Sequence, residues 1–346
     1  MYFLASLATI ALAAQGALAA TAFGWATGTT GGAGAAEAIP SSVQQLKQWA
    51  QSLSKDASHG AVLPTPNWPS MITVTYKKAP TIPIQLGSNK TLRGKGSAGW
   101  IKGKGLRIVG ATNIIIQNVR FSDMNQQYVW GGDAITIHGG SKIWIDHNYF
   151  KDVGRQFIVT GFGPSTQVTI SNNYFDGRAT YSPFCDGYHY WGTMITGEAD
   201  TITFAYNYVY HASGRAPKVG GGDGSTQTIH AYNNYFHDIS GHALDAGTGS
   251  RILFEGNYIE SVKTPTTGDP NGSIFAPTSS SMNTQCSSAI GRNCVSNTLV
   301  SSGSLSNVAN SGVLSNFKKS FVTSNKVLDA SAVKAHVLAN AGLGKI

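Results

Sequence analysis

The chain is poor in charged residues. Only 12% of its 346 residues are Asp, Glu, Lys or Arg, which is about half the usual share for a globular protein. Because 41% of the residues are hydrophobic, the chain has enough apolar side chains to form a core, and a disordered protein is excluded. The formal net charge is +8, and a basic surface attracts nucleic acid, anionic membranes or acidic polysaccharides. No dense run of Lys or Arg is present, so the sequence predicts no nucleic-acid partner.

The N-terminus lacks cations, since the first Lys or Arg is Lys47. An Ala- and Leu-rich run ends at Ala20 and contains the small-x-small pattern Ala17-Leu18-Ala19. We therefore predict a signal peptide over residues 1–19 and a secreted, extracellular protein. An N-terminal membrane anchor is the alternative, which the shortness of the run disfavours. No later segment is apolar enough to span a bilayer, so we expect no membrane partner.

Cysteine is scarce, with only three residues in the chain. In a secreted protein, the close pair Cys286 and Cys294 is expected to form a disulfide. Cys185 is then either a buried thiol or a residue that has lost its partner. Two sequons begin at Asn89 and Asn271, and we regard both as candidate glycosylation sites.

Asparagine and glycine are abundant, and asparagine recurs at the ends of short β-type runs. Between about Ile72 and Val262, phrases such as Asp146-His147-Asn148-Tyr149-Phe150 and Ser171-Asn172-Asn173-Tyr174-Phe175 repeat, with Asn at 118, 148, 173, 207, 234 and 257. The spacings of 23 to 34 residues lie in the range of solenoid repeats. We expect Asn to adopt the left-handed conformation at each bend and to hydrogen-bond to the coil above. The sequence thus predicts an all-β protein, a parallel β-helix, over an antiparallel sandwich, for which hairpin signals are few.

The predicted organisation is a single domain over residues 20–346. Its core coils occupy about 72–265, with short peripheral helices at 41–55 and 328–342 and long loops, among them 277–312 packed over the coil. Helix 41–55 is expected to begin at a Ser41 or Ser42 cap. We place the C-terminal loop and helix together at 277–346.

The phrase Gly214-Arg215-Ala216-Pro217-Lys218-Val219 presents two cations three residues apart. Hydrolysis of a sugar chain through an oxocarbenium ion needs two carboxylates. Chemistry centred on Arg215 instead indicates a transition state that develops negative charge, and so favours carbanion chemistry.

Together with that phrase, Trp130-Gly131-Gly132-Asp133, Trp144-Ile145-Asp146-His147, Gly154-Arg155-Gln156 and His189-Tyr190-Trp191-Gly192 resemble the secreted pectin lyases of polysaccharide lyase family 1. The resemblance runs from about Ile72 to Cys294. It implies a right-handed parallel β-helix and endo-cleavage of α-1,4-linked galacturonan by β-elimination, which leaves a 4,5-unsaturated product. The Trp-Ile-Asp-His and Arg-x-Pro-Lys phrases also occur in the pectate lyases of the same superfamily.

The resemblance implies that Arg215 is the catalytic arginine. A guanidinium resists deprotonation, so two roles stay open. Either Lys218 and Arg155 favour a neutral Arg215 that removes the C5 proton, or Arg215 stays charged and stabilises the enolate-like oxygen while water or hydroxide takes the proton.

The other residues that match the pectin lyases suggest an esterified substrate. Arg155 stands in the region where pectate lyases place carboxylates for calcium, and Asp133 is expected to pair with it as electrostatic support. Trp130, Tyr190 and Trp191 are expected to bind sugar faces and methyl esters. We therefore predict methylesterified pectin as the partner, no metal or cofactor, and a monomer. We expect Asp146, His147 and His189 to be structural residues.

Three rival functions stay open. One is a calcium-dependent pectate lyase and another is a β-helical glycoside hydrolase. The third is a catalytically impaired pectin-binding β-helix, because the chain lacks a longer cysteine- and tryptophan-containing segment that the resemblance implies before Ile72. That difference would also remove the partner of Cys185.

Overall fold

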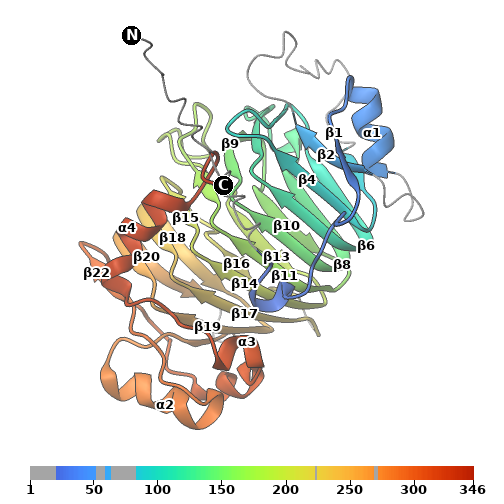
Figure 1. Cartoon of the computed structure of the whole chain (residues 1–346). Helices are drawn as coiled ribbons and strands as arrows, with labels where there is room; N and C mark the ends of the chain where they lie inside the picture. The colour runs from blue at the N-terminus through green and yellow to red at the C-terminus, as the bar shows by residue number, and fades with distance from the viewer. Residues whose placement is uncertain (1–20, 52–58, 64–82, 223, 269–271) are drawn as a thin grey trace, which may run out of the picture.

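The strands of the chain stack into a parallel β-solenoid (Figure 1). This computed structural model describes residues 21–51, 59–63, 83–222, 224–268 and 272–346. The predicted signal peptide, residue Asn271 and the expected start of the coils at Ile72 lie outside these residues. The all-β parallel solenoid predicted from the asparagine repeat is confirmed, since all 21 strand pairs are parallel.

Each turn of the solenoid contributes to three faces. The face that we call the site sheet comprises β3 (Ile84–Leu86), the first part of β6 (Leu106–Gln117), the first part of β8 (Ile135–Asp146), β10 (Ile158–Gly161), β13 (Thr193–Thr196), β16 (Lys218–Val219), and the last parts of β18 (Tyr235–Ala246) and β20 (Tyr258–Gly268).

The second sheet follows along the chain in every turn. It comprises β1 (Ala36–Ala38), β2 (His59–Leu63), β4 (Lys90–Gly94), the last parts of β6 and β8, β11 (Ser165–Ser171), β14 (Ala199–Ala205), β17 (Thr226–Tyr232), β19 (Ser250–Glu255) and β21 (Ser273–Phe275).

The third sheet closes each turn before the chain returns to the site sheet. It comprises β5 (Trp100–Lys102), β7 (Arg120–Met124), β9 (Tyr149–Val153), β12 (Tyr174–Asp176), β15 (Tyr208–Tyr210), the first parts of β18 and β20, and β22 (Thr298–Val300).

Aliphatic and aromatic side chains stack along the inside of the solenoid. In the second sheet, fully buried residues lie opposite one another from turn to turn, namely Ile114, Ile143, Val168, Ile202, Ile229 and Ile252. In the third sheet, Phe150 stacks between Phe121 and Phe175, with ring centroids 5.1 Å away on each side. Burying such a side chain contributes roughly 1.5–3 kcal/mol, so each turn is stabilised by its neighbours.

A ladder of internal asparagine side chains joins the turns. In most turns the ladder residue and the left-handed bend residue are different residues, which the sequence did not reveal. The ladder consists of Asn148, Asn173, Asn207, Asn234, Asn257 and Asn297. From Asn173 onward, the side-chain oxygen of each accepts hydrogen bonds from the backbone and side-chain nitrogens of the Asn one turn earlier, at 2.9–3.1 Å. At the bends before Asn148, Asn173, Asn207, Asn234 and Asn257, the left-handed residue is the one directly before the ladder Asn, as with His147 (φ 53°) and Tyr206 (φ 59°). The expectation that one Asn does both is wrong for Asn148, Asn173, Asn207, Asn234 and Asn257, but it holds for Asn118, whose Nδ2 donates to the Gly94 carbonyl of the preceding turn at 2.9 Å. Asn118 (φ 58°) is a bend residue, and Val119 occupies its turn's ladder position.

The expected peripheral helices are present with shorter bounds. Helix α1 (Val43–Gln51) begins after Ser42, whose hydroxyl accepts a hydrogen bond from the Gln45 backbone at 3.1 Å. Residues 52–55 of the prediction lie outside the described residues. Helix α4 (Ala330–Asn340) packs Val333 and Val337 against Tyr235 of the third sheet. These helices cover one end and one flank of the solenoid (Figure 1).

The solenoid continues beyond the expected limit near residue 265, which corrects that boundary. Strands β21 and β22 extend the second and third sheets, and the expected loop 277–312 contains β22 and helix α2 (Ser280–Ile290). The Ser-rich sequence of α2 does not indicate a helix. The helix is capped by the Ser279 side chain at its N-terminus and ends at Gly291, which is in the left-handed conformation. The short helices η1 (Gly24–Ala26), η3 (Ser311–Phe317) and α3 (Ser320–Thr323) complete the fold. Within the described residues, no helix has the length and apolar character needed to cross a membrane.

Candidate active site

The predicted site residues lie at the same kind of position in successive turns, where the chain passes from the third sheet to the site sheet. Four consecutive connections provide these residues. The first carries Trp130 and Asp133, the second Arg155, the third Tyr190 and Trp191, and the fourth Arg215. Lys218 is the first strand residue after the fourth connection. Because the turns stack in register, side chains that are 85 residues apart in sequence are brought to one edge of the site sheet.

Asp133 and Arg155 form the expected ion pair. The Arg155 guanidinium donates from Nε to Asp133 Oδ1 at 2.8 Å and from its terminal nitrogen to Oδ2 at 2.6 Å. Asp133 also accepts from the Gln156 backbone at 2.9 Å. The Asp133 side chain is 4% exposed and that of Arg155 is 46% exposed. The hydrogen bonds to Asp133 raise the pKa of Arg155 above its usual value, so Arg155 is a fixed cation at this edge.

Arg215 differs from Arg155 because no described carboxylate lies within 4.0 Å of it. Its guanidinium carbon lies 4.6 Å from the Trp191 ring centroid and 5.3 Å from that of Tyr190. Its Nε is buried without a hydrogen-bond partner among the described residues. A cation held by aromatic faces keeps its charge uncompensated, so Arg215 is available to a negative group on a bound molecule.

Local backbone geometry places Arg215 in this pocket of aromatics. Its φ of 50° lies in the left-handed region, which a non-glycine residue rarely adopts. The preceding Gly214 allows Tyr190 to pack on the backbone, since a Cβ there would lie 2.6 Å from the Tyr190 ring and 2.9 Å from His242. The sequence signal for this close approach is Gly214, the glycine that directly precedes Arg215.

Gln156 connects the two arginines and was not predicted as a site residue. Its side chain is only 2% exposed. With its amide oxygen facing Arg215, it accepts from the guanidinium at 2.6 Å while its nitrogen donates to the Gly192 carbonyl at 3.1 Å, and this orientation satisfies both groups. Because Gln156 directly follows Arg155 in the chain, its side chain links the Arg215 guanidinium to the connection that contains Arg155.

Lys218 faces outward in a row that runs across the site sheet. The row consists of Arg107, Thr136, Val159, Met194, Lys218 and Asp245 on adjacent strands. Lys218 donates to Asp245 at 3.0 Å, and His242 lies 3.7 Å from the same carboxylate oxygen. Burial, Lys218 and Arg215 together lower the pKa of His242 despite Asp245. Asp245 and His242 could not be predicted from the sequence, because the strand register that brings them to Lys218 is not visible within one turn.

The three predicted aromatic residues do not form one continuous floor. Tyr190 and Trp191 pack edge to face, with centroids 5.1 Å apart, beside Arg215. Trp130 lies two connections away in η2 (Val129–Gly131), is 53% exposed and stacks on Tyr128 at 4.8 Å. The structure thus places two aromatics around the Arg215 guanidinium and one at the rim of the neighbouring groove.

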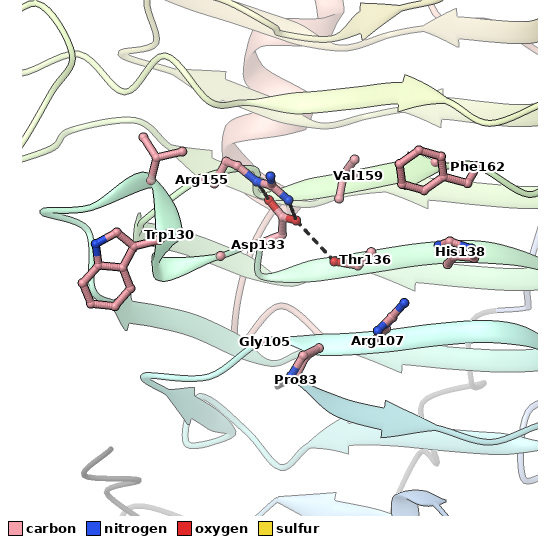
Figure 2. A pocket seen from close by; sticks show the side chains of 13 residues that line it. Pro83, Gly105, Arg107, Trp130, Asp133, Thr136, His138, Arg155, Val159 and Phe162 are labelled. Atoms are coloured by element: carbon pink, nitrogen blue, oxygen red, sulfur yellow. Dashed lines mark hydrogen bonds and ion pairs between the residues drawn. The ribbon is translucent and has the colours of Figure 1, made fainter. Parts of the chain in front are cut away.

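That groove has a volume of about 380 Å³. Trp130, Asp133 and Arg155 lie towards one end, and His138 and Phe162 lie at the other, with Thr136 and Arg107 between them (Figure 2). Asp133 and Arg155 thus face the groove. The lining combines apolar surface with two arginines, Arg107 and Arg155, and its one carboxylate, Asp133, is paired with Arg155. Such a lining suits an extended molecule that carries negative or ester groups.

The carboxylates of this edge do not fit a calcium site. Calcium takes six to eight oxygen ligands, several of them carboxylates. Here Asp133 is bound by Arg155 and Asp245 by Lys218, so each carboxylate already faces a cation. Among the described residues no group of three or more His, Cys, Asp or Glu side chains is placed to hold a metal ion.

The remaining predicted residues are placed as follows. Cys286 and Cys294 form the expected disulfide, and Cys185 is a free, exposed thiol rather than a buried one. Asn89 is half-buried, with its side chain hydrogen-bonded to Asn113 at 2.8 Å. His189 is buried, and its Nε2 contacts the carbonyls of Arg155 and Trp191 at 2.9 and 3.0 Å, in agreement with a structural role.

The chain belongs to the pectate lyase family, whose model matches residues 1–346. It is 42% identical to a probable pectin lyase F-2 of Aspergillus terreus, over 94% of this chain and 74% of that protein. It is 45% identical to pectin lyase B of Emericella nidulans, over 81% of this chain and 72% of that protein. The first alignment extends over 363 positions, more than this chain has residues, so that relative contributes positions with no counterpart here.

Solved structures of low sequence identity share the fold. A pectate lyase bound to a hexasaccharide superimposes with a TM-score of 0.65 at 18% identity, covering 94% of this chain and 97% of that one. Pectate lyase II of Xanthomonas campestris superimposes with a TM-score of 0.62 at 20% identity, covering 94% and 98%. These matches establish the solenoid architecture of the chain.

Proposed function

We propose that this chain is a secreted pectin lyase that cleaves methylesterified pectin within the polymer by β-elimination. The observation that carries the proposal is the state of Arg215, a cation between two aromatic rings with no described carboxylate beside it. The pectin lyases among its relatives, at 42% and 45% identity, support the substrate class.

The chemistry needs a site for developing negative charge. Removal of the C5 proton leaves an electron pair that delocalises onto the oxygen of the C6 ester. The pair then forms the C4–C5 double bond as the C4–O bond breaks, and the departing oxygen takes up a proton. Arg215 would stabilise the enolate-like oxygen, since its charge is not already neutralised. Water or hydroxide is the proton acceptor that this role requires, because a charged guanidinium has no lone pair to offer.

The surroundings of Arg215 would hold the polymer and fix its register. Gln156 hydrogen-bonds to the guanidinium and restricts its rotation. Arg155, fixed by Asp133, and Lys218, paired with Asp245, add positive potential at the same edge. Tyr190, Trp191 and Trp130 offer aromatic surface to sugar faces and methyl esters.

We further propose that the reaction needs no calcium and that the enzyme works as a monomer. A methyl ester withdraws electrons from C5 without a metal. The pairing of Asp133 and Asp245 with cations supports this reading over that of a calcium-dependent pectate lyase. A glycoside hydrolase would need two carboxylates free to act on the bond, and these two carboxylates are occupied.

The test is ultraviolet detection of the unsaturated uronide product. The purified protein is incubated with high-methyl pectin and with polygalacturonate, each with added calcium and with a chelator. We expect product from high-methyl pectin in both conditions and little from polygalacturonate. Product that disappears with the chelator would identify a pectate lyase, and binding without any unsaturated product would identify an impaired binding protein.

A further inference from the structure

Next to the end of the groove farthest from Trp130 lies an exposed arginine, Arg107, that the proposed reaction does not use. Arg107 lies on β6 in the same outward row as Lys218, with Thr136, Val159 and Met194 on the strands between them. Four strand spacings of roughly 4.8 Å place Arg107 about 19 Å from Lys218 along the solenoid. None of the described carboxylates lies within 4.0 Å of Arg107, so its charge faces the groove uncompensated.

Phe162 stands over the same end of the groove in an unusual conformation. It follows β10 with a φ of 59°, in the left-handed region that a bulky side chain rarely adopts. Its side chain is 81% exposed, so the core gains nothing from the ring. Glycine stands on both sides, at Gly161 and Gly163, yet the strained position itself holds an aromatic residue. Strain that gives no packing in return is a feature of functional positions.

The His138 ring, on the strand next to that of Arg107, packs against the ring of Phe162. The His138 and Phe162 ring centroids are 5.4 Å apart, with the planes tilted by 44°. His138 is two residues along β8 from Thr136, the direct neighbour of Arg107. Figure 2 shows Phe162 above His138 and Arg107 on the adjacent strand. An aromatic face and a guanidinium therefore flank one part of the groove.

We propose that Arg107, His138 and Phe162 form an outer subsite for a galacturonate unit with a free carboxylate. The inference rests on the proposed function, and it adds that this enzyme acts on partly de-esterified pectin. The guanidinium fork matches the two oxygens of a carboxylate, whereas a methyl ester offers it no charge. The exposed ring of Phe162 supplies a face for the sugar, and the net charge of +8 attracts a polymer with some free acids.

The first experiment compares Arg107→Gln with the unmodified protein on two substrates, fully methylesterified pectin and partly de-esterified pectin. We expect the KM for the partly de-esterified polymer to rise about threefold to fivefold, as for the loss of one exposed ion pair, with kcat unchanged. The KM for the fully esterified polymer stays within about twofold. Arg107→Lys keeps the charge and should restore part of the loss.

The second experiment uses Phe162→Asn, because Asn tolerates the left-handed conformation. We expect a higher KM on both substrates and an unfolding midpoint that is equal or higher, since an exposed ring is lost and strain is relieved. A lower midpoint with unchanged KM would show that Phe162 is structural and would overturn the subsite. The matched control is Arg251→Gln, an exposed arginine on β19 away from the groove, which should change neither KM.

The two proposals fail in different ways. If the unmodified protein forms no unsaturated product, the proposed function fails, and calorimetric titration with partly de-esterified pectin then tests the subsite by binding alone. If product forms but Arg107→Gln has the same effect on both polymers, the subsite is wrong and the proposed function stands.

Discussion

The Arg155 guanidinium binds the Asp133 carboxylate through two parallel hydrogen bonds, at 2.8 and 2.6 Å. Both nitrogens that face the carboxylate are therefore occupied, and the positive charge of Arg155 is partly neutralised at short range. Arg215, in the connection two turns further on, has aromatic rings where Arg155 has a carboxylate. In the proposed reaction the two arginines would therefore have different roles, Arg155 in positioning and Arg215 in stabilising new negative charge.

Replacing Arg215 by Lys tests its task directly. The substitution keeps the charge and loses the planar fork, so we expect kcat on high-methyl pectin to fall by about 100-fold or more, or roughly 2.7 kcal/mol, with a smaller change in KM. Steady-state kinetics measures this, and Arg251→Lys is the control on an exposed arginine outside the site. Turnover close to that of the unmodified protein would mean that Arg215 is not the central residue.

Replacing Asp133 by Asn releases the Arg155 fork. We expect at least a tenfold loss of kcat/KM, about 1.4 kcal/mol, because Arg155 is no longer fixed. The molecule offers a matched control in Asp176, which binds Arg178 with the same two distances of 2.8 and 2.6 Å on the third sheet. Asp176→Asn should cost stability but leave kcat/KM unchanged, as measured by thermal unfolding and kinetics. Equal losses of activity in both variants would reduce the role of Asp133 to stability.

Most of the chemistry-bearing residues were predictable from the sequence, but their relationships were not. Arg215, Lys218, Arg155 and Asp133 stand in the short phrases that carry the family resemblance, and the structure brings them to one edge of the site sheet. Gln156, Asp245 and His242 enter the site only through strand register and the stacking of turns, which a repeat with spacings of 23 to 34 residues leaves undetermined.

The fold class could likewise be predicted from the repeated residues, whereas the exact role of each position could not. The repeated asparagines indicate the solenoid, yet a shift of one residue separates the bend position at Asn118 from the ladder position at Val119. Helix α2 escapes prediction because Ser is a weak helix former whose side chain competes for backbone hydrogen bonds. Its capping by Ser279 and its contacts with the rest of the fold decide the conformation instead.

The buried His189 predicts a loss of stability in acid. Burial lowers its pKa to about 4 despite two carbonyl contacts, against 6.5 for an exposed histidine. The unfolded chain therefore binds a proton first, so the stabilisation is complete above pH 6.5 and is lost as the pH falls towards 4. The loss should amount to about 3 kcal/mol.

Denaturant unfolding between pH 7 and pH 4 checks this for the unmodified protein and for His189→Gln. The glutamine keeps a donor for the carbonyls but does not titrate, so the variant should lose about 3 kcal/mol less over that range. Identical pH dependence in the two proteins would contradict the assignment.

A break in the asparagine ladder should be costly. Asn207→Leu keeps the approximate shape but leaves the backbone and side-chain nitrogens of Asn173 without their acceptor in the core. We expect the free energy of unfolding to fall by about 3 kcal/mol or more, since buried donors lose their partners. The control is Asn340→Leu, on an exposed position of α4, which should change stability by about 0.5 kcal/mol or less. A comparable effect of the two substitutions would show that the ladder contributes little.

The asparagine ladder lies inside the solenoid, apart from the connections that carry the predicted site residues. It joins the turns inside the solenoid, while the site residues predicted from the sequence lie on, or directly after, connections outside it. A connection can therefore lengthen, shorten or change its side chains without altering the pitch at which the others are presented. A pectin chain bound across the turns would therefore contact side chains at a constant turn-to-turn spacing. The side chains of one turn can change the specificity without moving those of the next turn.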